Sequence, residues 1–270
     1  MPSDHPTESP PLSSVAVVCG GTAGIGLATA ARIARNRARV VVLGRHSDQV
    51  ARAVEVLAEG GADRPVGHVA DARRPELLAP AFDKVAEQFG YVNALVNAVG
   101  PSVVGTFDDL DDDDWTRAFD EGTMTAVRSI RCALPLLRRA SWARIVNVTA
   151  MSVQHQTPAL VAYTAAKSAL ASVTKNLART LAPEGILVNA VAPGSVLTER
   201  ISGAVRAVGG DPSDPVEAYR VMAEQFGAHI DLGRVARPED VAEVVAFCAS
   251  PDIGFLTGAH INVDGGSDFV

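Results

Sequence analysis

The chain of 270 residues is 47% hydrophobic but only 5% aromatic, and its formal net charge is −7. A chain of this length and apolar content suits one large α/β domain with a substantial buried core. The negative charge makes nucleic acid and anionic membranes unfavourable partners. No apolar run is as long as a membrane span, so a membrane protein is not expected either.

Residues 1–13 at the start of the chain are rich in proline and lack the apolar region of a signal peptide. We expect them to form a disordered tail. The scattered cysteines, Cys19, Cys132 and Cys248, indicate a reduced cytoplasmic protein in which they serve as small apolar residues. Their spacing is typical neither of a metal site nor of a disulfide framework, so we predict no metal.

Strand and helix patterns alternate along the rest of the chain. The expected strands span residues 15–19, 39–43, 66–69, 94–97, 145–148, 187–191 and 260–263. The expected helices span residues 24–35, 47–58, 75–89, about 111–139, 160–181 and 238–249. This alternation predicts a single α/β domain over residues 14–270, with a parallel sheet and right-handed crossovers.

Residues 195–235 interrupt this alternation with a segment rich in glycine, proline and charge. Two short helices are expected inside it, at residues 200–208 and 216–226. Long insertions near the carboxyl ends of strands often cover a substrate, which makes this segment a candidate lid. A floppy surface insertion is the alternative.

A glycine-rich turn joins the first strand to the first helix, with the sequence Gly20-Gly21-Thr22-Ala23-Gly24-Ile25-Gly26. Gly20 permits a tight turn with positive φ, whereas Gly24 and Gly26 let the backbone approach a pyrophosphate. The helix that follows offers amide donors and a partial positive charge at its N-terminus. Between a strand and an Ala-rich helix, this turn predicts a dinucleotide site.

The second strand ends at Gly44-Arg45, where a carboxylate would select NAD(H) by binding ribose hydroxyls. The Arg45 guanidinium suits a phosphate instead, so the sequence favours NADP(H) over NAD(H). A solvated arginine at a strand end is the alternative. Ala23 adds no second cation to the turn.

Tyr163 and Lys167 stand four residues apart in an expected helix and therefore share one face. A tyrosine with an ordinary pKa of about 10 is a poor proton donor or acceptor at neutral pH. The Lys167 ammonium is expected to lower the pKa of Tyr163 and to favour its phenolate. The pair predicts acid–base catalysis, although the same spacing also occurs on ordinary helix faces.

Together these features resemble the short-chain dehydrogenase/reductase family from about residue 14 to the C-terminus. Further motifs that carry the resemblance are Asp71, Val96-Asn97-Ala98-Val99-Gly100, Asn189-Ala190-Val191-Ala192-Pro193-Gly194 with Thr198, Arg237-Pro238-Glu239-Asp240 and Asp264-Gly265-Gly266. The resemblance implies a Rossmann-type doubly wound sheet of seven strands in the order 3-2-1-4-5-6-7, flanked by helices. It also implies a nicotinamide cofactor and hydride transfer between that cofactor and a carbonyl or alcohol.

The resemblance extends the cofactor site beyond the turn and Arg45. The full set of expected cofactor contacts is Gly20, Thr22, Ala23, Gly24, Ile25, Gly26, Arg45, Asp71, Ala72, Asn97, Ala98, Val99, Tyr163, Lys167, Pro193, Gly194, Val196 and Thr198. Asp71 and Ala72 would face the adenine, and Lys167 would hold the nicotinamide ribose. Tyr163 would pass a proton to or from the substrate oxygen.

Two side chains that the family usually uses are missing. The position thirteen residues before Tyr163, usually serine, is Ala150, and the position of the usual asparagine is Gly122. Extended backbone brings Ser152 back to the face of Ala150, so Ser152 is the candidate replacement for the lost hydroxyl. A hydroxyl that only satisfies loop backbone is the alternative. Gly122 would permit a helix kink without supplying a side-chain amide.

The helix at 160–181 and the apolar face of residues 126–137 carry more small and apolar residues than one sheet face needs. The family usually forms homotetramers through these two helices and the last strand, and we expect the same here. The acidic run at residues 111–114 predicts a helix N-terminus that complements the helix dipole, with a metal site as the alternative.

The sequence therefore predicts an NADP(H)-preferring oxidoreductase that interconverts a carbonyl and an alcohol on a mainly apolar small molecule. A 3-oxoacyl thioester and a small cyclic ketone are equally open as substrates. Tyr163, Lys167 and Ser152 are the predicted catalytic residues. One alternative is a catalytically weakened dinucleotide-binding or regulatory protein, and another is a non-redox dehydratase or isomerase on the same scaffold.

Overall fold

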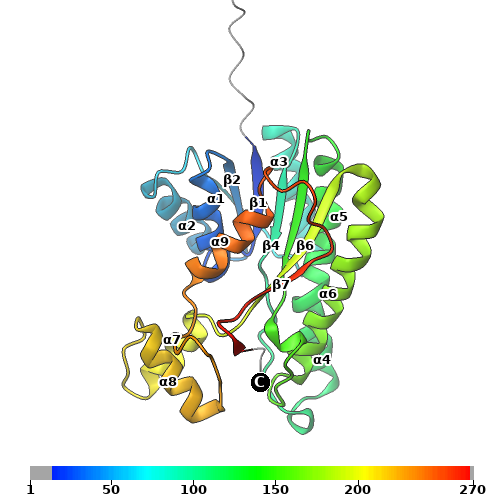
Figure 1. Ribbon diagram of the computed structural model, residues 1–270. Coiled ribbons are helices and arrows are strands. Elements are labelled where there is room, and N and C mark those ends of the chain that lie inside the picture. Colours follow the sequence, from blue (N-terminus) through cyan, green and yellow to red (C-terminus); the bar gives the residue numbers. More distant parts are fainter. Residues whose placement is uncertain (1–13, 268–270) are drawn as a thin grey trace, which may run out of the picture.

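The computed structural model describes residues 14–267, so the tail expected at residues 1–13 lies outside the described residues. A seven-stranded sheet with the order β3-β2-β1-β4-β5-β6-β7 runs through the centre (Figure 1). Every neighbouring pair of strands is parallel, and Val17 on β1, for example, lies opposite Val41 on β2 and Leu95 on β4. Strand order and direction confirm the Rossmann-type fold.

The predicted strands and helices are present with small shifts at their ends. The strands are β1 Val15–Cys19, β2 Arg39–Gly44, β3 Val66–Val69, β4 Ala94–Asn97, β5 Ala143–Val148, β6 Ile186–Pro193 and β7 His260–Val263. The helices are α1 Gly24–Ala34, α2 Ser47–Glu59, α3 Pro75–Phe89, α4 Asp112–Phe119, α5 Thr125–Leu137, α6 Val161–Leu181, α7 Glu199–Ala207, α8 Pro215–Phe226 and α9 Pro238–Cys248. Over residues 14–267, none of the helices combines the length and apolar character that crossing a bilayer requires.

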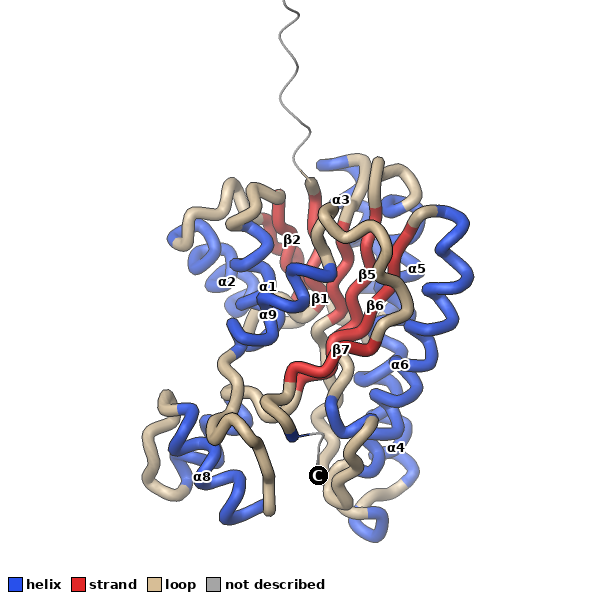
Figure 2. Tube along the Cα trace, in the orientation of Figure 1, coloured by secondary structure: helices blue, strands red, loops and turns tan. Residues whose placement is uncertain are grey.

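Helices cover both faces of the sheet, as Figure 2 shows. On one face α1, α2 and α9 pack through side chains such as Ala30, Leu57 and Val245. On the other face α3 and α5, with the end of α6, pack through side chains such as Phe82 and Ile130. Because both faces are covered, the strands are nearly continuous runs of apolar residues.

The carboxyl ends of all strands meet at one edge of the sheet because the strands run in the same direction. The strand order reverses between β1 and β4, so the chain leaves these two strands toward opposite sides. In open parallel sheets a ligand binds in the crevice at this point. The loops after β1 and β4 therefore mark the place to look for a site.

The helix expected over residues 111–139 contains a wider turn. α4 leads into a π-helical turn, η2 (Asp120–Met124), and α5 continues from it. Gly122 lies inside this turn and is buried. π turns within α-helices are frequent at functional sites. At the position where Gly122 is expected to permit a kink, the helix changes from α-helical to π-helical.

The acidic run before α4 begins a helix, as predicted. Asp111 caps α4, because its side chain accepts a hydrogen bond from the Asp114 backbone N–H at 2.9 Å. The carboxylates that follow lie in the first turn, where they complement the helix dipole. Among residues 14–267, no group of three or more His, Cys, Asp or Glu side chains is arranged to hold a metal ion.

The segment at residues 195–235 folds as a small layer of its own, which Figure 1 shows below α9 and apart from the sheet. α7 and α8 are the two helices expected there. They share an apolar cluster formed by Ile201, Val205, Ala218, Val221, Ile230 and Val235. The segment therefore has a small apolar core of its own, and its role as a lid stays a prediction.

Candidate active site

The glycine-rich turn between β1 and α1 has a shape that only residues without a side chain can adopt. Gly20 has a φ of 78°, and its N–H donates to the Leu43 carbonyl at 3.0 Å, which bends the chain over the end of β2. A Cβ on Gly26 would lie 2.0 Å from the Gly20 carbonyl oxygen, so only glycine fits there. The turn presents bare backbone and a helix N-terminus, which fits the pyrophosphate of a dinucleotide.

A cavity opens beside this turn at the ends of β1, β2, β3 and β4. Its lining includes six of the predicted cofactor residues, namely Gly20, Thr22, Arg45, Asp71, Ala72 and Val99. It also includes Gly100 of the expected β4 motif, and Gln49, Arg73, Ser102 and Glu121, which sequence reasoning did not select. Only Arg73 carried a signal in the sequence, since it follows Asp71 by two residues in the same loop.

The remaining predicted cofactor residues of the turn, the β4 loop and β6 lie close by but do not line this cavity; they are Ala23, Gly24, Ile25, Gly26, Asn97, Ala98, Pro193, Gly194, Val196 and Thr198. Thr198 reaches the turn, because its Cγ2 lies 3.4 Å from where a Cβ of Gly24 would stand. The Asn97 side chain instead points into the protein and donates to Asn147 Oδ1 at 2.8 Å. Asn97 can therefore serve a cofactor through its backbone only.

The charged side chains of the cavity wall are unequally paired. Arg73 forms a bidentate ion pair with Asp71, in which Nη2 lies 2.8 Å from Oδ2, and these bonds hold the pKa of Asp71 below its usual range. Arg45 also acts on the Asp71 carboxylate, but it has no ion-pair partner of its own among residues 14–267. Arg45 is therefore the cation of this wall that is left for a ligand phosphate.

The first turns of α6 bring Tyr163 and Lys167 to the ends of β4 and β5. Lys167 is only 2% exposed, and its Nζ donates to the Val148 carbonyl at 2.7 Å and to the Val99 carbonyl at 3.2 Å. Burial lowers the pKa of Lys167 from 10.5 to about 7. The lysine thus joins α6 to the ends of two strands, and one of its partners, Val99, also lines the cavity.

The phenol of Tyr163 differs from the sequence expectation. Burial raises the pKa of Tyr163, and the cation that opposes this effect is Arg200, not Lys167. The prediction that Lys167 lowers this pKa is wrong for the described structure, because the Lys167 ammonium is itself buried and turned toward two carbonyls. Nothing in the Tyr-x-x-x-Lys spacing could indicate a second cation from a distant segment.

Arg200 stands in the first turn of α7, two residues after Thr198, and it is exposed. The other arginines of residues 195–235 are all paired, Arg206 with Glu199, Arg220 with Glu217 and Arg234 with Asp240. Arg200 forms no hydrogen bond or ion pair with any of residues 14–267. Its charge is therefore available to the phenol and to a ligand in front of it.

The predicted replacement for the missing serine is buried against α6. Ser152 lies in the short turn η3 (Met151–Val153) and is 3% exposed. Its Oγ accepts a hydrogen bond from Thr164 Oγ1 at 3.0 Å. Thr149 faces the other way, because its Oγ1 donates to the Val191 carbonyl at 3.1 Å. Ser152 stands beside the helix of Tyr163, and its contact with substrate stays a prediction.

The position of the missing asparagine has no room for a side chain. A Cβ on Gly122 would stand 2.9 Å from Ala166 Cβ and 2.9 Å from Pro101 Cγ. Real Cβ atoms do not approach other carbon atoms so closely. The close contact between the π-helical turn and α6 therefore takes the space that an amide would need.

Comparison with known proteins agrees with this geometry. The family model described as enoyl-(acyl carrier protein) reductase matches residues 20–268. The chain is 33% identical to the short-chain reductase protein NovJ of Streptomyces niveus, with 98% of each chain covered. An actinorhodin polyketide ketoreductase solved with NADPH is 30% identical with a TM-score of 0.85, covering 96% of this chain and 98% of that chain.

A further similar structure is a short chain oxidoreductase from Pseudomonas aeruginosa PAO1, solved with NADPH and described as containing an atypical catalytic center. It is 28% identical with a TM-score of 0.86, and the match covers 94% of this chain and 96% of that chain. Because matches in both sequence and structure run through almost the whole chain, it belongs to the short-chain dehydrogenase/reductase family and is an NAD(P)-dependent oxidoreductase.

Proposed function

We propose that this protein is an NADP(H)-preferring oxidoreductase that interconverts a carbonyl group and an alcohol on a mainly apolar small molecule. The observation that carries the proposal is the position of the Tyr163 and Lys167 pair on α6. Lys167 Nζ donates to the carbonyl of Val99, and Val99 lines the cavity beside the glycine-rich turn. The acid–base pair and the dinucleotide site therefore adjoin each other.

Each residue of the pair has a separate task in this proposal. A bound nicotinamide cofactor supplies or accepts the hydride. Tyr163 gives a proton to the substrate oxygen during reduction and takes one back during oxidation. Lys167 fixes the helix that carries Tyr163 and holds the nicotinamide ribose. Ser152, oriented by its bond with Thr164, donates a hydrogen bond to the substrate oxygen.

The preference for NADP(H) rests on the charges of the cavity wall. Arg45 follows β2 without an ion-pair partner among the described residues, while Asp71 is already bound by Arg73. A free guanidinium beside the adenosine half of the site favours a 2′-phosphate. Two similar structures were solved with NADPH, which supports the same choice.

The substrate class is drawn from the lid and the relatives. The apolar cluster of α7 and α8 supports a mainly apolar molecule. The polyketide ketoreductase among the similar structures, together with the acyl carrier protein reductase description of the family model, supports a 3-oxoacyl type of carbonyl compound. Residues 195–235 would act as the lid over this substrate.

A second candidate function is a weakened or non-redox protein on the same scaffold. Ala150 and Gly122 occupy the places of two usual catalytic side chains, and the packing at Gly122 leaves no space to restore one. A dinucleotide-binding regulatory protein, a dehydratase or an isomerase would tolerate these losses. Single-turnover oxidation of bound NADPH against a panel of carbonyl compounds separates these functions from the oxidoreductase.

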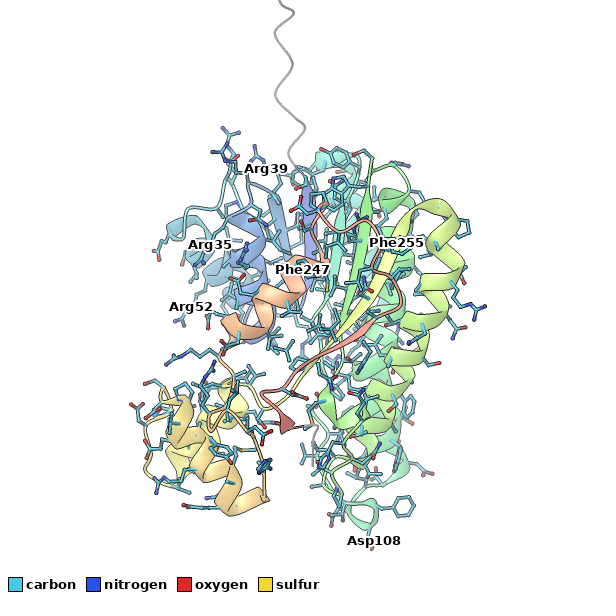
Figure 3. All side chains as sticks on the ribbon, viewed as in Figure 1. Arg35, Arg39, Arg52, Asp108, Phe247 and Phe255 are labelled. Carbon is cyan, nitrogen blue, oxygen red and sulfur yellow. The ribbon has the colours of Figure 1, made fainter. Side chains whose placement is uncertain are left out.

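We also propose a cytoplasmic homotetramer. Two large aromatic side chains support an assembly through the region of β7, because Phe255 precedes this strand and is fully exposed, and Phe247 on α9 is 57% exposed (Figure 3). Exposed aromatic residues on neighbouring elements are typical of interfaces. A second copy of the chain is the expected partner for these exposed side chains.

The first test replaces the proposed proton donor. Tyr163→Phe should lower kcat by about 10²–10⁴-fold, because general acid–base catalysis contributes this much, while the Kd for NADPH stays unchanged. Tyr91→Phe, a half-buried tyrosine before β4 that packs against the α3 and α5 side of the core, is the matched control and should keep full activity. Redox turnover that survives Tyr163→Phe would refute the proposed role.

The second test concerns cofactor choice. Arg45→Gln should weaken NADPH binding by about 10- to 100-fold, the value of a charge-assisted hydrogen bond, and leave NADH binding nearly unchanged. Fluorescence titration of both reduced cofactors measures this. Arg52→Gln on the exposed side of α2 removes the same charge and should change neither Kd (Figure 3). Equal losses for both cofactors would contradict a 2′-phosphate contact.

The third test concerns Arg200 and pH. Because the Arg200 charge lowers the pKa of Tyr163 against the effect of burial, Arg200→Gln should raise this pKa. Alcohol oxidation needs the phenolate, so its rising pH limb should move to higher pH. Carbonyl reduction needs the phenol and should persist to higher pH. Arg200→Lys should resemble the parent protein, and Arg206→Gln on the same helix should not shift either limb.

The fourth test concerns assembly. Phe255→Asp should lower the molar mass measured by light scattering, because a carboxylate would be buried against the partner copy. Val56→Asp, which changes an exposed apolar residue of α2, should leave the mass unchanged. A parent protein that is already monomeric at micromolar concentration would remove the tetramer from the proposal.

A further inference from the structure

A cluster of polar side chains connects the cavity wall to the π-helical turn. Glu121 in this turn accepts hydrogen bonds on Oε2 from the Ser102 backbone N–H and from Ser102 Oγ, both at 2.8 Å. Its other oxygen, Oε1, lies 3.6 Å from Arg73 Nη1. Arg73 in turn holds Asp71, so four side chains from two loops and the π-helical turn form one network.

Glu121 is an unusual member of this network because it is buried. Its side chain is 9% exposed, whereas the Arg73 side chain is 37% exposed. Removing a carboxylate from water is costly unless it is fully bonded, and here both of its oxygens have partners. A glutamate exposed on the surface would be hydrated by water and would not need these contacts.

The network fixes the π-helical turn at a place where Gly122, the residue next to Glu121, has no side chain to do so. Gly122 carries no side chain and has no room for one between Ala166 and Pro101. The polar side chains on either side do bond to their surroundings, since Glu121 holds the loop after β4 and Thr123 Oγ1 donates to the Ala166 carbonyl at 2.7 Å. The turn is thus fixed at both ends.

The far end of this connection lies next to the catalytic pair. Ala166 immediately precedes Lys167 and stands three residues after Tyr163 on α6. The Ala166 carbonyl is the group that Thr123 binds, so any displacement of the turn acts on α6 at this point. The contacts of Glu121 therefore affect the position of α6 beside the cavity.

We propose that Glu121 is a positioning residue, which through Arg73 and Ser102 holds the π-helical turn and thereby sets the place of Tyr163 and Lys167. This inference rests on the proposed function, since it assigns those two residues to proton transfer and ribose binding. Glu121 lines the cavity, but its carboxylate is bound by Ser102 and Arg73, and in this proposal it acts on the reaction only through the turn.

The test separates positioning from direct binding and from plain stability. Glu121→Gln removes the charge and keeps the shape. It should lower kcat by about 10- to 100-fold, the effect expected of a displacement of about 1 Å, and weaken NADPH binding severalfold. Adenosine 2′,5′-bisphosphate, which lacks the nicotinamide half, should bind with an unchanged Kd. Glu184→Gln, which removes a carboxylate from the exposed ion pair with Arg138, is the matched control and should change none of these values.

Two results would overturn the inference. If the bisphosphate lost affinity in parallel with NADPH, Glu121 would be a direct contact of the adenosine half. If only the melting temperature fell while kcat and both Kd values stayed unchanged, Glu121 would serve stability alone. Because NADPH binding needs no turnover, a parent protein without redox activity would refute the proposed function and leave the test of Glu121 intact.

A second pair of variants keeps the inference testable if Glu121→Gln folds poorly. Arg73→Gln leaves Glu121 buried without its cation, so it should lower the melting temperature more than Glu121→Gln does. The double variant should melt above Arg73→Gln, because the uncompensated charge is gone. If the fall in melting temperature of the double variant equalled the sum of the falls of the single variants, Arg73 and Glu121 would not act together, which would contradict the inference.

Discussion

The buried ammonium of Lys167 is the constraint on which the rest of the site depends. An ammonium that is 2% exposed is costly unless acceptors surround it. Here the acceptors are the carbonyls of Val148 and Val99, at and just after the ends of β5 and β4. Such carbonyls are free at this edge because the parallel strands stop there. Once Lys167 is held, the tyrosine one helical turn before it must lie over the same edge, beside the glycine-rich turn.

Close packing beside Lys167 limits the size of residue 122. A Cβ on Gly100 would lie 3.8 Å from Lys167 Nζ, which is an ordinary contact and does not by itself require glycine. Ala166, next to Lys167, meets Gly122 so closely that a side chain at position 122 has no space. In this packing no asparagine side chain fits at position 122. Polar contacts of the neighbouring residues Glu121 and Thr123 hold the turn that the asparagine would otherwise occupy.

Sequence alone predicts the parts of this site that depend on local pattern. The glycine-rich turn, the strands and the Tyr163 helix follow from periodicity and spacing, and the strand order follows from the family resemblance. Contacts between distant segments carry no such signal. Glu121 and Ser102 are nineteen residues apart, and Arg200 comes from a different layer than the phenol that it affects. The direction of the Lys167 ammonium also escaped prediction, because a spacing of four residues fixes a shared face but not the partners of a side chain.

The acid–base strength of Tyr163 finally depends on two separate layers of the protein. Burial against the sheet layer raises the pKa of the phenol, and Arg200 from the layer of α7 and α8 lowers it. The first effect is built into the core, whereas an exposed charge such as Arg200 is screened by salt within about a Debye length. The balance between them therefore requires α7 to keep its place near the phenol. The shared apolar cluster of α7 and α8 provides this, because it gives the layer a fixed shape without drawing Arg200 into an ion pair.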